Sequence, residues 1–261
     1  MKTILITLVS TFSLLFAAEV NAQIWIVNNN PSGAGHFTDA EEAYSNATAG
    51  DTLYLVPSES AYTIEEITTK QIHVFGSGYF LDENDDTVFD ASQSVLRTDR
   101  IFGENWSGAA DGSTFTGLTI KETDQRIRVH ADNISFKRCY ILDSISGPNA
   151  NFDGLTIVQS YIANAIGLNG SYTGIYISNS YIGGTNQIAG LSSGLIANSI
   201  IDAGLTDLVN LNIENNIFLD EEALNLFDTS ENNTITNSIF VHEEPSNPGT
   251  NNQFNIDPST L

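Results

Sequence analysis

A motif of about twenty residues recurs six times in the second half of this chain. Each copy begins with Gly or Asn, continues with alternating apolar residues, and places a small residue before a second apolar pair. Because one copy cannot bury its own apolar face, the repeat predicts a solenoid in which the copies stack. The steps between copies are 21, 20, 19, 17 and 22 residues, measured between the small residues Cys139, Ser160, Ser180, Ser199, Asn216 and Ser238.

Each copy has the pattern of one β-solenoid rung. Alternation with a period of two, as at Leu155 and Ile157, predicts a strand with one buried face. Gly and Asn tolerate the positive φ of a tight turn. We expect rungs about 4.8 Å apart to place like residues on like and to form a continuous core. Side-chain amides precede the small residue in five copies and predict a hydrogen-bonded ladder, at Gln159, Asn179, Asn198, Asn215 and Asn237.

With these rungs and amides, the sequence resembles the right-handed parallel β-helix repeat proteins, the pectate-lyase-like superfamily. The predicted fold class is therefore all-β, a solenoid of about 20-residue rungs. Helical solenoids are excluded because a rung has no room for two helices. An immunoglobulin-type sandwich is the structural alternative, but sandwiches do not repeat one motif at this interval.

The N-terminal region divides into a leader and a cap. Residues 1–22 carry Lys2, an apolar run and a small-residue cleavage site before Gln23, which predicts a signal peptide and a secreted protein. Residues 23–95 are expected to hold an N-terminal cap and the first rungs. A capping box with Thr38 as N-cap and Glu41 at N3 predicts a short helix. The resemblance implies that this helix plugs the open end of the coil.

Residues 96–261 are expected to form the parallel β-helix. The last rung-like segment, residues 252–257, lies four residues before Leu261, and no capping element follows it. We therefore expect either a fragment or a short tail that folds over the end, and favour the fragment.

The charge balance limits the partners. The chain has 32 acidic and 9 basic residues and a net charge of −23, which would repel nucleic acid and anionic membranes. The single cysteine, Cys139, cannot form an intramolecular disulfide. The leader apart, no apolar run approaches the length of a membrane span. We expect a monomer, and a polysaccharide is the partner that the resemblance implies.

The catalytic motifs of the related enzymes are missing. The resemblance implies pectate lyases and polygalacturonases, whose lyase base is usually Arg or Lys close to calcium-binding carboxylates. No Lys or Arg follows Arg138, and the Asn-Thr-Asp, Gly-His-Gly and Arg-Ile-Lys motifs are absent. We therefore expect a non-catalytic extracellular or surface protein that contacts carbohydrate. The alternative is a polysaccharide lyase or glycoside hydrolase acting on an acidic polysaccharide.

One basic segment is the candidate site. Arg126, Arg128 and His130 alternate with apolar residues, so all three should point outward from one strand, and they are the catalytic candidates if the chain is an enzyme. Their cations could hold an anionic sugar. The competing interpretation, which we favour, is that these cations pair with neighbouring acids. The accompanying candidate ligand-binding residues are Lys121, Lys137, Asp132, Asp153 and Trp106.

Two further sets have weaker signals. Acidic residues on successive turns could bind Ca²⁺, although solvated turn residues are the favoured interpretation and no metal site is predicted. Three tyrosines at equivalent positions, Tyr140, Tyr161 and Tyr181, form either an exposed stripe or ordinary packing under a loop, which we favour. The acidic set comprises Asp202, Asp207, Asp220, Glu221, Glu222, Asp228 and Glu231.

Overall fold

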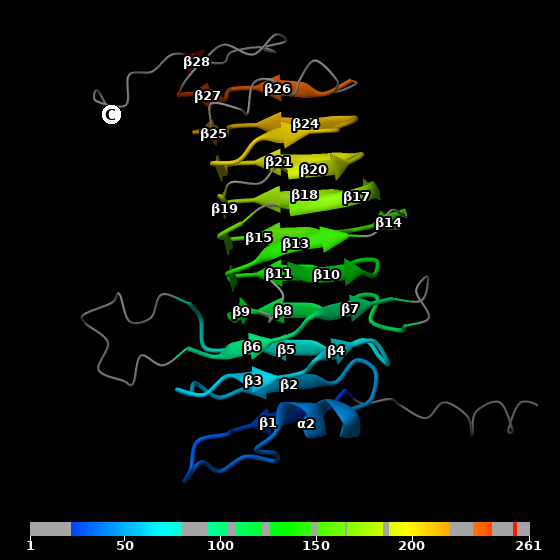
Figure 1. The fold of residues 1–261 in the computed structure, drawn as a ribbon, viewed down its shortest axis with the longest axis vertical. Helices are drawn as coiled ribbons and strands as arrows, with labels where there is room; N and C mark the ends of the chain where they lie inside the picture. Colours follow the sequence, from blue (N-terminus) through cyan, green and yellow to red (C-terminus); the bar gives the residue numbers. More distant parts are fainter. Residues whose placement is uncertain are drawn as a thin grey trace, which may run out of the picture.

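The computed structural model is a parallel β-solenoid built from three sheets, with one short helix near the N-terminus (Figure 1). The predicted fold class is therefore confirmed. Each complete rung contributes one strand to each sheet, and the strands stack along the long axis of the molecule. The structure describes residues 22–79, 93–103, 108–121, 126–147, 151–164, 166–184, 188–219, 232–241 and 253–254.

Ten strands form sheet A, in which every neighbouring pair is parallel. In order, they are β1 (Ile24–Val27), β2 (Thr52–Leu55), β5 (His73–Phe75), β8 (Thr114–Thr116), β11 (Ser135–Lys137), β15 (Thr156–Val158), β18 (Ile175–Ser178), β21 (Gly194–Ala197), β24 (Leu211–Glu214) and β26 (Thr234–Thr236).

Sheet B follows sheet A in each rung and has short strands. These are β3 (Tyr62–Thr63), β6 (Val95–Arg97), β9 (Thr119–Lys121), β12 (Tyr140–Ile141), β16 (Tyr161–Ile162), β19 (Tyr181–Ile182), β22 (Ile200–Ile201), β25 (Ile217–Phe218), β27 (Ile239–Phe240) and β28 (Gln253–Phe254). Sheet C completes the rung with β4 (Glu66–Ile67), β7 (Arg100–Phe102), β10 (Arg126–His130), β13 (Ser144–Gly147), β17 (Ile166–Thr173), β20 (Ile188–Leu191) and β23 (Leu205–Thr206), and β14 (Phe152–Asp153) pairs with β17.

The core consists of columns of like residues, one per rung. In sheet A the column from Phe115 to Ile235 is at most 2% exposed, and its steps are 21, 21, 20, 19, 17 and 22 residues. The predicted repeat is thus the rung of the solenoid. Each buried Leu, Ile or Phe side chain contributes about 1.5–3 kcal/mol relative to an exposed one.

A ladder of hydrogen bonds joins the turns between sheets A and B, one residue later than predicted. The backbone N–H of Ser160 donates to Ser180 Oγ, and that of Ser180 to Ser199 Oγ, both at 3.2 Å. The preceding amide residues, such as Asn179 and Asn198, are exposed and have φ of 50° and 52°. The amides therefore form the left-handed corner of the turn, and the small residues beside them form the ladder.

One member of this left-handed column is an arginine, which gives a stability prediction. Arg138 is exposed and has φ 49°, where branched or long L-residues are strained and Asn is tolerated. Arg138→Asn is expected to raise the free energy of unfolding by about 0.5–1 kcal/mol, measured by urea denaturation. Lys137→Asn, on the neighbouring strand position, is the control and should bring no gain. A loss of stability in Arg138→Asn would contradict this account of the turn.

The helix α2 (Ala40–Asn46) lies at the N-terminal end of the stack, beside β1 (Figure 1). Its Ala40, Ala43 and Tyr44 side chains are buried in the same core as the first rungs, as the predicted cap requires. The predicted N-cap was wrong by one residue. Asp39 is the N-cap, because its backbone is extended and its carboxylate accepts the N–H of Glu42 at 2.8 Å.

Candidate functional site

The basic segment of the sequence forms strand β10 on the outer face of sheet C. Ile127 and Val129 point into the core and are 0% and 1% exposed. Arg126 and Arg128 alternate with them and lie on the outside, Arg126 exposed and Arg128 half-buried. The predicted alternation is therefore confirmed for the two arginines.

The pairing of neighbouring strands brings further cations close to Arg126 and Arg128, which the sequence alone did not predict. Arg100 of β7 pairs with Arg128, and Arg97 of β6 pairs with Lys121 of β9 at the adjoining edge of sheet B. The cations of sheets B and C lie close together along the chain, since Arg97 and Arg100 are only three residues apart. We call this set the basic corner: Arg97, Arg100, Lys121, Arg126 and Arg128.

The basic corner contrasts with the rest of the molecule. It holds five of the nine Lys and Arg residues of a chain whose net charge is −23. Glu66 of β4 forms an ion pair with Arg100, which was not among the predicted site residues. Arg97, Arg100 and Arg126 are exposed, and their guanidinium groups can meet an anion from solvent.

His130 has a different environment from the arginines. Its ring stacks on Phe102 with centroids 4.5 Å apart and lies 6.3 Å from the ring of Phe152, and the residue is only 8% exposed. Burial, together with the Arg128 and Arg100 cations, lowers the pKa of His130 to about 4. The ring is therefore neutral at pH 7 and packed between aromatic side chains, which does not suit a general acid or base.

The acidic candidates lie on another edge of the solenoid, between sheets C and A. The N–H of Asp153 donates to Asp132 Oδ1 at 2.8 Å, and the N–H of Asp132 donates to Asp111 Oδ1 at 2.7 Å. These aspartates thus bridge consecutive rungs. Asp111 was missed, although its spacing of 21 residues from Asp132 is visible in the sequence.

The remaining candidates are dispersed. Lys121 lies in the basic corner, whereas Lys137 is exposed on β11 of sheet A. Trp106 lies outside the described residues, as do five of the calcium candidates: Asp220, Glu221, Glu222, Asp228 and Glu231.

Two calcium candidates lie within the described ranges. Asp202 accepts a hydrogen bond from Tyr181 Oη at 2.8 Å, and Asp207 occupies a turn with φ 52°. Across the described part of the chain, no group of three or more His, Cys, Asp or Glu side chains is placed to hold a metal ion.

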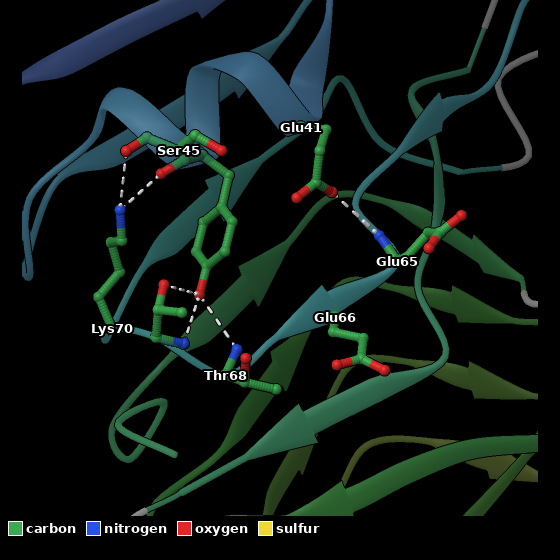
Figure 2. A pocket seen from close by; sticks show the side chains of 8 residues that line it. Glu41, Ser45, Glu65, Glu66, Thr68 and Lys70 are labelled. Atoms are coloured by element: carbon green, nitrogen blue, oxygen red, sulfur yellow. Dashed lines mark hydrogen bonds between the residues drawn. The ribbon is translucent and has the colours of Figure 1, made fainter.

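A pocket of about 470 Å³ adjoins the basic corner at the start of sheet C (Figure 2). It opens between α2 and β4, and its Glu66 is the partner of Arg100. Its lining is polar apart from the ring of Tyr44, and comprises Glu41, Tyr44, Ser45, Glu65, Glu66, Thr68, Thr69 and Lys70.

Several of these side chains have structural roles (Figure 2). Tyr44 Oη accepts the N–H groups of Thr68 and Thr69 at 3.1 and 2.9 Å, and a Glu41 carboxylate oxygen accepts the N–H of Glu65 at 3.2 Å. Lys70 Nζ donates to the carbonyl oxygens of Tyr44, Ser45 and Ala47 at the end of α2. The helix thereby satisfies backbone groups on both sides of β4, the edge strand of sheet C.

The tyrosine column is present in the predicted register on the outside of sheet B. Tyr161 and Tyr181 stack with centroids 4.5 Å apart, and Tyr140 meets the edge of Tyr161 at 5.1 Å. Tyr79, from the segment after β5, lies 6.4 Å from Tyr140. The three rings are half-buried and face one another, which agrees with packing and not with an open platform.

No helix in the described ranges is long and apolar enough to cross a membrane. Comparison of the chain with protein-family models, with curated proteins and with solved structures found no match.

Proposed function

We propose that this chain is a secreted β-solenoid that binds an acidic polysaccharide through the basic corner and does not cleave it. The main support for this proposal is that five cations lie together on one edge of a protein whose net charge is −23. Export rests on the leader-like residues 1–22, and kinship with the pectate-lyase-like superfamily rests on the resemblance of the rungs.

The geometry of the basic corner suits a polyanion. Paired arginines on adjacent strands lie about 4.8 Å apart, and Arg126 lies two residues from Arg128 on the same strand. Each guanidinium can bind a carboxylate or sulfate with two parallel hydrogen bonds. Several weak ionic contacts along a repeating polymer then add up to useful affinity.

The environment of His130 favours binding over catalysis. A lyase or hydrolase would need a base or acid that reaches the sugar, and the buried ring of His130 is stacked on Phe102. The histidine on the same strand as the two arginine candidates, His130, is packed against Phe102 and does not reach the surface beside them. The proposal therefore assigns Arg126 and Arg128 to ligand binding.

Affinity electrophoresis in gels containing polygalacturonate or alginate tests the proposal on residues 23–261. Arg126→Ala/Arg128→Ala is expected to weaken retention about a hundredfold or more, since it removes two charge-assisted contacts of about 1.5–3 kcal/mol each. Added salt should weaken retention of the unchanged protein. Lys137→Ala, which removes an exposed cation from sheet A, is the matched control.

Two outcomes would overturn the proposal. Equal retention of the double variant and the unchanged protein would remove the basic corner from binding. Release of unsaturated uronates or new reducing ends during incubation with the polysaccharide would instead establish the lyase or hydrolase alternative.

A further inference from the structure

The three outer faces of the solenoid differ in chemistry, and sheet A carries the exposed aromatic residues. Among the described residues, the large hydrophobic side chains with marked exposure include three aromatics: Tyr54 at 39%, Phe75 at 38% and Tyr176 at 42%. All three lie on sheet A, on strands β2, β5 and β18. They alternate with core residues and therefore point outward.

The register defines how these rings lie along the solenoid. Tyr54 and Phe75 are direct neighbours on adjacent strands, and Ile26 of β1 precedes them in the same column. Tyr176 lies five strand steps from Tyr54, about 24 Å away along the axis. The aromatic side chains thus occupy two separate places on one elongated face.

Hydroxyl side chains precede Tyr176 in its own outward column, which is adjacent to the column of Tyr54 and Phe75. Thr114 and Thr156 are half-buried outward residues of the intervening strands, and Thr114 Oγ1 lies 2.8 Å from His73 Nδ1. Of the residues that point outward from sheet A between β2 and β18, Lys137 is the one with a lysine, arginine or carboxylate side chain. We call this surface the sheet A platform: Tyr54, Phe75, Thr114, Thr156 and Tyr176.

We propose that the sheet A platform binds an uncharged stretch of a linear polysaccharide lying along the solenoid axis. This inference deepens the proposed function and rests on it in taking a polysaccharide as the partner. Pyranose rings have apolar C–H faces that pack on aromatic rings, and equatorial hydroxyls that bond to hydroxyl side chains. An extended glycan repeats at a distance close to the rung spacing, so successive sugars meet successive strands.

The distribution of the apolar residues argues against a second copy of the chain as the occupant. A stable protein interface buries about 800 Å² on each partner and has a continuous apolar centre. Here the apolar groups are separated by three strands of mainly polar residues, β8, β11 and β15. Two copies of net charge −23 would also repel each other.

Affinity electrophoresis at high salt, in gels that contain xylan, galactomannan or hydroxyethylcellulose, tests the platform. At least one of these uncharged polymers should retain the protein, and Tyr54→Ala/Phe75→Ala should raise the dissociation constant about tenfold or more. Tyr176→Ala should also weaken retention. Ile200→Ala is the matched control, because Ile200 is a 38% exposed apolar residue on sheet B.

The outcomes separate this inference from the proposed function. Retention by none of the polymers, or equal retention of the double variant, overturns the platform. A halved mass of the double variant in light scattering also overturns it, because the platform would then be a contact between two copies. Loss of uncharged-polymer binding in Tyr54→Ala/Phe75→Ala supports the platform even if Arg126→Ala/Arg128→Ala retains normal binding to acidic polymers.

Discussion

Asn216→Ala is expected to lower the free energy of unfolding by about 4 kcal/mol. Asn216 is 1% exposed and takes the place of a serine in the ladder between sheets A and B. Its Oδ1 accepts the N–H of Ser199 at 2.9 Å, and its Nδ2 donates to the carbonyl oxygen of Ile196 at 2.8 Å. Alanine leaves the buried N–H of Ser199 without a partner, at about 1–3 kcal/mol, and it also removes the hydrogen bond to Ile196 and adds a small cavity.

Two companion variants make this test specific. Asn216→Ser restores the hydroxyl found in the neighbouring rungs and should lose only about 1–2 kcal/mol. Asn212→Ala, on the exposed side of β24, should change stability by less than about 0.5 kcal/mol. Urea denaturation followed by circular dichroism gives all three values. A loss below about 1 kcal/mol in Asn216→Ala would mean that the ladder contributes little.

Acidification is expected to remove about 3 kcal/mol of stability through His130 alone. The pKa of this group falls from 6.5 in the unfolded chain to about 4 in the folded protein. Between these values the unfolded chain binds more protons than the folded protein. The contribution is therefore complete above about pH 6.5 and is lost progressively as the pH falls towards about 4.

His130→Phe isolates this effect from the titration of the many carboxylates. Phenylalanine preserves the stack with Phe102 and cannot be protonated. The difference in unfolding free energy between the two proteins should change by about 3 kcal/mol between about pH 7 and about pH 4, by urea denaturation. Parallel stability curves for the two proteins would show that His130 is accessible to protons in the folded state.

The core could be predicted from the sequence because the period of two settles which side chains point inward. Leu155, Ile157 and their equivalents were therefore placed correctly before any coordinates. The ladder was misplaced by one residue, since Asn179 and Ser180 are both polar and only the backbone dihedrals tell which one turns inward. The N-cap of the helix was misassigned for the same reason, because Thr38 and Asp39 are adjacent polar residues and both can cap a helix.

The candidate site was only partly predictable, because it depends on contacts between rungs. Arg126 and Arg128 share one strand, so their common face was evident. Arg100 joins them only through strand register. The rung that contains Arg100 is unusually long, because the paired core residues Val74 and Phe115 are 41 residues apart, and this length hides the repeat in the sequence. Tyr54 and Phe75 are 21 residues apart, which is one rung, but they lie before this gap and the sequence analysis did not connect them with the later repeats.

The way α2 binds the edge of sheet C protects the N-terminal end of the solenoid. Glu41 and Tyr44 occupy the N–H groups of the residues that flank β4, which could otherwise pair with a strand from another molecule. Stacked parallel strands are the geometry of amyloid fibrils, and an unprotected terminal rung would template their growth. The docked helix therefore hinders fibril elongation along the sheet C edge of the N-terminal end.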